Sequence, residues 1–449
     1  MKKLRAGSGP AHRITSVFVE QLFGLHTYDI RISGRPGVRG PTLLILYGDN
    51  GTGKTTILQL IYHLLGKEDD RGHRSFLARV PFRRLRVTLD PKVVVEAQRP
   101  GPDLVGGYLL SLRYGETLVA EAEAIVDPDL AVRSSSTGTE RQRTAWQLLL
   151  NALGTLDLTF FLLTDDRRSD QTRNDPQHID RETLRRSWGK QHREKKGADL
   201  RLEETVERLE KWIRDEALKA SNIGEAGTNT VYVDIAKRLA QTHRPGRPNR
   251  TASDQLVRSL VDLELRSKPY ASLGLVSHPN LSEIVDVLES VPLARRSLIA
   301  SVISPYVESL RARLDALQDI QELVTLFLER INSFFRNKSV RYHLSGGLVI
   351  DTPQGAPLKP SQLSSGERQL FALLAEVVTA RRAASVFLID EPEISLNIKW
   401  QRVLVDTLLQ LVRGTDVQFM LATHSVELLA THREHVHRLD GSFSDNRAL

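Results

Sequence analysis

The stretch with the clearest chemistry is a glycine-rich run of eight residues, GDNGTGKT at positions 48–55. It fits the pattern G-x4-G-K-[ST], in which glycines let backbone N–H groups wrap a phosphate without a side-chain clash. An apolar run at 42–47 precedes it, and an apolar stripe at helical spacing follows it as far as Gly66. A buried strand, a loop and a helix N-terminus form the context that binds phosphate. The predicted binding residues are Gly48, Asn50, Gly51, Gly53, Lys54, Thr55 and Thr56.

Two side chains of this loop suit a nucleotide bound with a magnesium ion. Lys54 can bridge β- and γ-phosphate oxygens, and Thr55 can supply an oxygen ligand to Mg²⁺. A nucleotide bound together with Mg²⁺ is therefore the predicted ligand.

A pair of acids ends another buried-type strand much later in the chain. Four apolar residues, 386–389, lead into Asp390 and Glu391. In parallel α/β sheets, ligands lie at the carboxyl ends of the strands. Asp390 is suited to hold Mg²⁺, and Glu391 is suited to polarise an attacking water. Taken alone, such a pair would more often be a solvated strand end.

A third buried-type strand, VQFMLAT at 417–423, delivers His424 to the same edge. A neutral histidine there can bind the γ-phosphate or orient the water. A lone histidine after a strand is usually structural, so this interpretation depends on its neighbours.

The stretch SQLSSGERQL, residues 361–370, predicts a helix start. Ser364 is the expected N-cap, and Glu367 is spaced to close a capping box. Local chemistry leaves open whether Ser364 also contacts a ligand.

Together these motifs resemble the ABC-type ATPases, within the SMC/RecF/OLD-like branch. The resemblance rests on GDNGTGKT, LSSGE, VFLIDEPE, the following SLN and LATHS. It implies that LSSGE is a signature motif, which contacts the γ-phosphate of ATP held by a second protomer. The implied signature residues are Ser364, Ser365, Gly366 and Glu367, and Ser395 and Asn397 belong to the implied D-loop. Glu391 and His424 are the implied catalytic residues of a Mg-dependent ATPase.

The resemblance also implies a homodimer or higher homo-oligomer with composite ATP sites. Two features of the family are not assigned: the Q-loop glutamine and the residue that stacks on adenine. The first half of the chain shows no convincing Q-loop glutamine. Phe23 and Tyr28 are candidates for adenine stacking, with core packing as the alternative for both.

Composition limits the setting of the protein. The 449 residues carry a formal net charge of +7 and no cysteine, which removes disulfides and thiolate zinc sites. No apolar run of about 18 residues exists, so we expect no membrane span and a cytoplasmic location.

The predicted fold class is α/β, a P-loop ABC-type head with a mixed or parallel core sheet and an antiparallel N-terminal subdomain. Residues 1–164 are the expected N-terminal lobe and 339–449 the C-terminal lobe. Residues 165–338 are the expected insertion, with a charged loop at 164–199 and a coiled-coil-like helical arm. We expect Pro305 to break the second arm helix, leaving about 30 residues, or roughly 45 Å.

Three functions are compatible with these features. A stand-alone ATPase of prokaryotic anti-phage defence, resembling the Septu, retron-associated and PARIS types, would sense a trigger and control a separate nuclease or toxin. We expect no fused TOPRIM nuclease, because only about 60 residues follow Asp390. A RecF/SMC-like DNA repair or clamping ATPase is the first alternative, with DNA as its partner. Basic stretches at 83–86, 190–196 and 244–250 suit DNA or an acidic partner, and a solvated surface is the alternative interpretation of them. An ATP-gated scaffold with little turnover is the second. A transporter subunit is disfavoured by the long insertion between Lys54 and Ser364.

Overall fold

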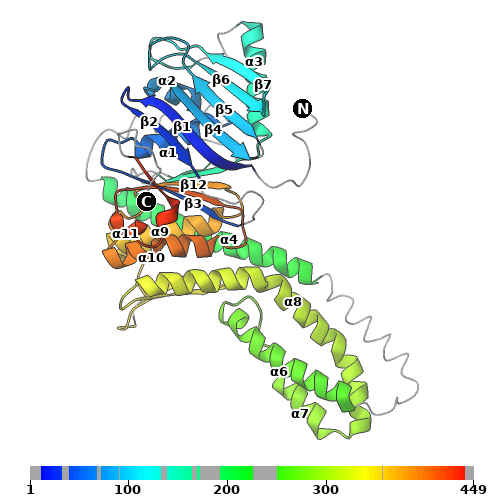
Figure 1. Cartoon of the computed structure of the whole chain (residues 1–449). Coiled ribbons are helices and arrows are strands. Elements are labelled where there is room, and N and C mark those ends of the chain that lie inside the picture. Colours follow the sequence, from blue (N-terminus) through cyan, green and yellow to red (C-terminus); the bar gives the residue numbers. More distant parts are fainter. Residues whose placement is uncertain are drawn as a thin grey trace. The chain divides into compact units, whose positions relative to one another are not determined.

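The computed structural model describes residues 12–32, 40–67, 72–90, 92–132, 139–163, 169–171, 193–225, 250–355 and 357–439 (Figure 1). The chain divides into two compact units. The first comprises Met1–Ser187 together with Ala380–Leu449, and the second comprises Trp188–Thr379. The first unit thus joins two segments that are far apart in the sequence. The domain boundaries drawn from the sequence stay predictions.

Six strands of the first unit form an antiparallel sheet in the order β2-β1-β4-β5-β6-β7. Their bounds are β1 (Arg13–Leu22), β2 (His26–Arg31), β4 (Arg84–Asp90), β5 (Val93–Gln98), β6 (Tyr108–Tyr114) and β7 (Thr117–Ala124). Alternate residues of β4 and β5 are buried, because successive side chains of a strand point to opposite faces. The antiparallel subdomain predicted from the sequence is confirmed.

The second sheet of this unit has the order β14-β3-β13-β12-β8-β9. Its strands are β3 (Thr42–Tyr47), β8 (Phe160–Leu163), β9 (Ser169–Gln171), β12 (Val386–Asp390), β13 (Gln418–Thr423) and β14 (Val436–Arg438). All pairings are parallel except that of β8 with β9. Every residue of β12 and β13 is buried, as expected for strands covered on both faces. The α/β fold class predicted from the sequence is confirmed.

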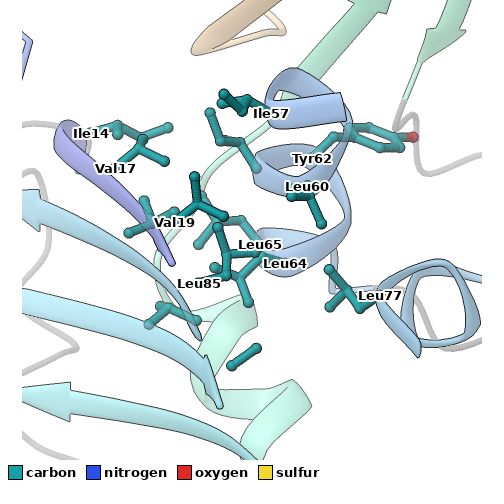
Figure 2. Packing of buried hydrophobic residues seen from close by; sticks show 14 of the residues in the cluster. Ile14, Val17, Val19, Ile57, Leu60, Tyr62, Leu64, Leu65, Leu77 and Leu85 are labelled. Atoms are coloured by element: carbon teal, nitrogen blue, oxygen red, sulfur yellow. The ribbon is translucent and has the colours of Figure 1, made fainter. Parts of the chain in front are cut away.

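Helix α1 (Lys54–Leu65) contributes to one hydrophobic core together with strands of both sheets. In Figure 2 its residues Leu64 and Leu65 lie beside Val19 of β1 and Leu85 of β4. The same cluster contains buried residues of β3 and β12. Burial on both sides fixes the axis of α1, and with it the helix N-terminus that follows the glycine-rich loop.

Four further helices and a 3₁₀ turn complete the described part of the first unit. They are α2 (His73–Arg79), α3 (Glu140–Gly154), α10 (Ile398–Leu411), α11 (Val426–Leu429) and η3 (Arg433–His435).

The second unit is mainly helical. Its elements are α4 (Arg193–Glu225), α6 (Arg250–Ser272), α7 (Ser282–Ser290), α8 (Leu293–Phe334), β10 (Ser339–His343), β11 (Gly347–Asp351), η2 (Pro360–Gln362) and α9 (Ser365–Ala380). Both α4 and α6 pack against α8. The predicted apolar stripe of the first arm helix is confirmed, since Leu202, Val206, Leu209 and Ile213 are all buried.

Two predictions about this part of the chain are wrong. Helix α8 continues through Pro305 without a break. A proline removes one backbone hydrogen bond at a cost of about 3 kcal/mol, and the packing of α8 against α4 and α6 outweighs it. The charged loop predicted at 164–199 contains strand β9, and its last residues already belong to α4. Residues 164–168 and 172–192 of that loop lie outside the described residues.

Within the described ranges, no helix combines the length and the apolar character that crossing a membrane requires.

A buried arginine connects helix α2 to the antiparallel sheet. Arg99 follows β5 and is 1% exposed. Its guanidinium donates to the carbonyl oxygens of Leu77 and Val80 at the end of α2, and to those of Phe82 and Gly106. It also lies over the Phe82 ring, 4.7 Å from the centroid. This one side chain therefore satisfies carbonyl groups that the end of α2 leaves unpaired.

We predict that Arg99→Met lowers the free energy of unfolding by about 3 kcal/mol or more, because several buried carbonyl groups lose their donor. Urea unfolding of the purified protein measures this change. Arg113→Met on the exposed side of β6 is the matched control and should change stability by less than about 0.5 kcal/mol. Equal effects of the two substitutions would contradict the assigned role of Arg99.

Candidate functional site

The glycine-rich loop joins the end of β3 to the start of α1. Gly51 and Gly53 have φ of 86° and 88°, a left-handed conformation that side chains other than glycine rarely adopt. A Cβ atom at Gly53 would lie 2.7 Å from Leu22 Cδ2, so both conformation and space require glycine there. Gly53 caps α1 without a side-chain hydrogen bond. The first N–H groups of α1 are therefore available to an anion.

The lysine of this loop is held in place by hydrogen bonds to carbonyl oxygens of the loop itself. Lys54 is 5% exposed, and its Nζ donates to the carbonyl oxygens of Gly48 at 2.8 Å and Asp49 at 3.0 Å. A buried ammonium in this position offers a charge-assisted donor to a phosphate oxygen. Thr55 and Thr56 follow in the first turn of α1, and Asn50 lies exposed in the loop. The donor set fits the phosphates of a nucleotide, with Thr55 as a hydroxyl ligand for Mg²⁺.

The β1–β2 hairpin contacts the loop from the antiparallel sheet. The Tyr28 hydroxyl donates to the Thr52 carbonyl oxygen at 3.0 Å, and the Tyr28 ring stacks on His26. Tyr28 is 5% exposed, so packing and this hydrogen bond occupy it. Phe23 is 40% exposed with a φ of 57°, and its ring edge lies near Gly53. Phe23 thus keeps a free ring surface beside the loop, whereas Tyr28 does not.

The register of the parallel sheet brings the other predicted motifs to the edge from which this loop leaves. Tyr47 of β3 pairs with Thr423 of β13, and Ala422 of β13 pairs with Asp390 of β12. The three strands therefore end at one level. Asp390 is 4% exposed, as suits a carboxylate that would face Mg²⁺ from inside the fold.

Glu391 adopts an uncommon backbone conformation at this edge. Its φ is 48°, and its N–H donates to the Ala422 carbonyl oxygen at 2.8 Å, which extends the ladder by one residue. The left-handed conformation costs energy for a residue with a side chain. Such strain at the end of a buried strand is a feature of functional sites.

His424 and two glutamates form a cluster at this edge. Nδ1 of His424 lies against Oε2 of Glu391 and 3.7 Å from Oε1 of Glu393. Burial first, and then the charge of Glu393 and a hydrogen bond with it, raise the pKa of Glu391 to about 7, while His424 acts in the opposite direction. A carboxyl group with a pKa near neutrality is suited to general base catalysis. The ligand atoms of these three residues lie within 4.8 Å of one another, so the cluster could also hold a metal ion.

Sequence reasoning missed two members of this site. Glu393 stands in the DEPE motif, but the motif alone predicts no role for it, because only its contacts with the residues at the end of β13 show one. From the sequence, Tyr28 is a candidate for adenine stacking or core packing, whereas in the structure its hydroxyl contacts the phosphate loop. A tyrosine early in a strand carries no signal of that contact.

The implied D-loop residues differ in environment. Ser395 is exposed in a left-handed turn with a φ of 64°. The Asn397 side chain accepts from the Trp400 N–H at 3.1 Å and caps α10. Asn397 therefore has a structural function in starting this helix.

The signature stretch belongs to the second unit, where the predicted capping box is confirmed. The Ser364 N–H donates to Glu367 Oε2 at 2.8 Å, and the Glu367 N–H donates to Ser364 Oγ at 3.4 Å. Lys338 Nζ also donates to Glu367. Burial alone would raise the pKa of Glu367, but the hydrogen bonds from Lys338 and Ser364 lower it overall. Ser364 and Ser365 are exposed, and Gly366 is buried.

Of the three basic stretches, only residues 83–86 have described side chains. Arg84 lies 3.9 Å from Glu20, and Arg86 lies 2.5 Å from Glu96. This stretch is thus partly neutralised by acids on neighbouring strands. The side chains at 190–196 and 244–250 lie outside the described residues.

Residues 236–430 match the family model described as "AAA domain, putative AbiEii toxin, Type IV TA system". The matched range contains the capping-box stretch, Asp390, Glu391 and His424, but not the phosphate loop.

Curated relatives match over shorter stretches. The lipoprotein-releasing system ATP-binding protein LolD 2 of Rhodopseudomonas palustris is 37% identical over 83 residues, which are 18% of this chain and 34% of that protein. The DNA double-strand break repair Rad50 ATPase of Halobacterium salinarum is 31% identical over 125 residues, which are 25% of this chain and 14% of that protein. The chain thus spans about a third or less of the length of these relatives.

Among solved structures, the Smc head domain of Pyrococcus furiosus with an extended coiled coil, bound to the C-terminal domain of ScpA, covers 93% of this chain. It has 15% identity and a TM-score of 0.38, and 91% of that chain is matched. The fold described above rests on the strand order of the chain and not on this similarity. The phosphate loop and the strand order are those of a P-loop α/β fold. The sequence matches are to AAA- and ABC-type ATPase domains, and over the matched stretches the chain is similar to the Rad50 and LolD ATP-binding proteins.

We predict that Tyr28→Phe weakens ATP binding about fivefold, because the Thr52 carbonyl loses a donor that contributes about 1 kcal/mol to loop geometry. Titration of a fluorescent ATP analogue measures the dissociation constant. Tyr114→Phe at the exposed end of β6 is the matched control and should bind as the wild type does. Unchanged affinity in the Tyr28 variant would remove this residue from the site.

Proposed function

We propose that the chain binds and hydrolyses ATP with Mg²⁺, and that ATP-dependent assembly of two or more copies senses a trigger and controls a separate effector. The proposed effector is a nuclease or toxin of prokaryotic anti-phage defence. The observation that carries the hydrolytic part is the contact of Glu391 with His424 at the edge from which the phosphate loop leaves.

Each residue of the site has a role in this proposal. The loop glycines and Lys54 bind the phosphates, and Thr55 and Asp390 would hold Mg²⁺. When bound, Mg²⁺ neutralises charge on the phosphate oxygens. Glu391 accepts the proton of the attacking water, since its carboxyl group titrates near neutrality. His424 holds the Glu391 carboxylate through Nδ1, and as an imidazolium it can also donate to a γ-phosphate oxygen through Nε2.

A second copy of the chain completes the site in this proposal. Ser364 and Ser365 are exposed at the start of α9, where N–H groups and hydroxyls can bind a phosphate oxygen. The capping box and Lys338 hold this turn in place. Ser395 is exposed in the turn before α10, as a D-loop residue at a dimer seam would be.

The effector part of the proposal is based on the family match. The matching family is described as a putative AbiEii toxin of a type IV toxin–antitoxin system, and that name favours a role in a toxin-based defence module. A pull-down that recovers a nuclease or toxin with the wild-type chain would support it.

The second candidate function is a DNA repair or DNA-clamping ATPase. The match to a double-strand break repair ATPase favours it. The arginines on β4 do not favour DNA binding, because Arg84 and Arg86 are paired with acids on neighbouring strands. An ATP-gated scaffold with little turnover stays the third candidate, and the rate of hydrolysis by the wild type distinguishes it.

We predict that Glu391→Gln keeps ATP affinity but lowers the rate of hydrolysis by about 100-fold or more, because the water loses its base. The variant should accumulate as an ATP-bound dimer, seen by light scattering with ATP and Mg²⁺. Glu116→Gln in the exposed β6–β7 turn is the matched control. Normal hydrolysis by the Glu391 variant would overturn the catalytic assignment.

We predict that two inactive variants restore activity when mixed. Lys54→Ala removes phosphate binding in one copy, and Ser364→Arg blocks the signature stretch in the other. A mixed dimer retains one intact composite site, so random pairing should recover about a quarter of the wild-type rate. Steady-state phosphate release across mixing ratios measures the recovery. If every ratio stays inactive, the site is not shared between copies.

A further inference from the structure

A third carboxylate at this edge has neither a predicted nor a proposed role so far. Glu393 is 4% exposed, and its Oε1 accepts the Thr423 hydroxyl. The same oxygen accepts the N–H groups of His424 and Ser425, each at 3.2 Å. A buried carboxylate is costly unless donors surround it. Here three donors from consecutive residues converge on one oxygen atom.

The three donor groups belong to His424 itself and to the residues on either side of it, Thr423 and Ser425. The His424 side chain is 57% exposed, so packing alone does not fix its position. Its backbone is held by Glu393, and the Ser425 N–H also donates to Thr423 Oγ1 at 2.9 Å. The place of the imidazole relative to Glu391 therefore depends on Glu393.

The same glutamate connects this turn to the D-loop. The Glu393 carbonyl oxygen accepts the Leu396 N–H at 2.9 Å. Gln401 of α10 donates to the Leu396 carbonyl oxygen at 2.9 Å, and its Oε1 accepts the Ser425 hydroxyl at 2.7 Å. Two hydrogen-bonded connections thus run from the turn before α10 to the residues that flank His424.

We propose that Glu393 is a positioning residue, which holds the 423–425 turn so that His424 meets Glu391 and which links that turn to the D-loop. This inference rests on the proposed hydrolytic function. Through Leu396 and Gln401, a second copy that contacts the D-loop would change the position of His424. In this role Glu393 acts through His424 and not by binding the nucleotide.

Steady-state ATP hydrolysis by the full chain tests this role. We expect Glu393→Ala to lower kcat about 100-fold, while KM for ATP changes less than about threefold, since the histidine is misplaced and the phosphate loop is not. Glu393→Gln keeps an oxygen acceptor for the three donors, so its kcat should fall by less than about fivefold. Glu121→Gln, at an exposed position of β7, is the matched control.

A double-mutant cycle tests whether Glu393 acts through His424. If it does, Glu393→Ala should cost less than about twofold when it is added to His424→Ala. Multiplicative losses in the double variant, or wild-type kcat in Glu393→Ala, would overturn the proposal. If Glu393→Ala does not fold, the pair Thr423→Val and Thr423→Ser replaces it. A fall in kcat in the Thr423→Val variant alone supports the proposal. Equal kcat values in the two Thr423 variants overturn it.

The two proposals fail in different ways. A wild-type chain without ATP hydrolysis overturns the proposed function. A wild-type chain that hydrolyses ATP, with an inactive Glu391→Gln and a fully active Glu393→Ala, overturns only the positioning role.

Discussion

The rest of the structure depends on the register in which β3, β12 and β13 pair. Because these strands are parallel and end at one level, a phosphate-binding loop, two acids and a histidine leave the sheet side by side. All residues of β12 and β13 are buried, so a slip by one residue would exchange the side chains of the two covered faces. Hydrophobic burial along the strands thus sets the geometry of polar groups beyond their ends.

This edge concentrates features that oppose stability. Glu391 has a left-handed backbone, and a second glutamate is buried two residues later. The strained Glu391 is held by the hydrogen bond that its N–H donates to the Ala422 carbonyl oxygen, and Glu393 is held by the donors of the 423–425 turn. The surrounding cores supply the rigidity that such an arrangement needs. The contrast with Arg99 is informative, since that buried charge satisfies carbonyl groups and has no place in the site.

Much of the fold and part of the site could be predicted from the sequence, for physical reasons. Strands covered on both faces leave continuous apolar runs, and a phosphate loop needs glycines at fixed spacing, so both are visible locally. The capping box of Ser364 and Glu367 is also local. The continuity of α8 through Pro305 cannot be predicted locally, because it depends on helices packed against α8. The roles of Glu393 and Tyr28 depend on partners far along the chain, Thr423 for one and Thr52 for the other, which no spacing rule reveals.

The order of the strands also has a consequence for biosynthesis. Strand β3 lies between β13 and β14, which the ribosome delivers about 370 residues later. Until then, both edges of an apolar strand lack their native neighbours, and the whole helical unit emerges before they arrive. Pairing across such separations is slow and exposes strand edges that can associate with other chains. A nascent chain that has not yet reached Val386 therefore contains the phosphate loop without the sheet that orients it, and it is at this stage that the protein most needs protection from aggregation.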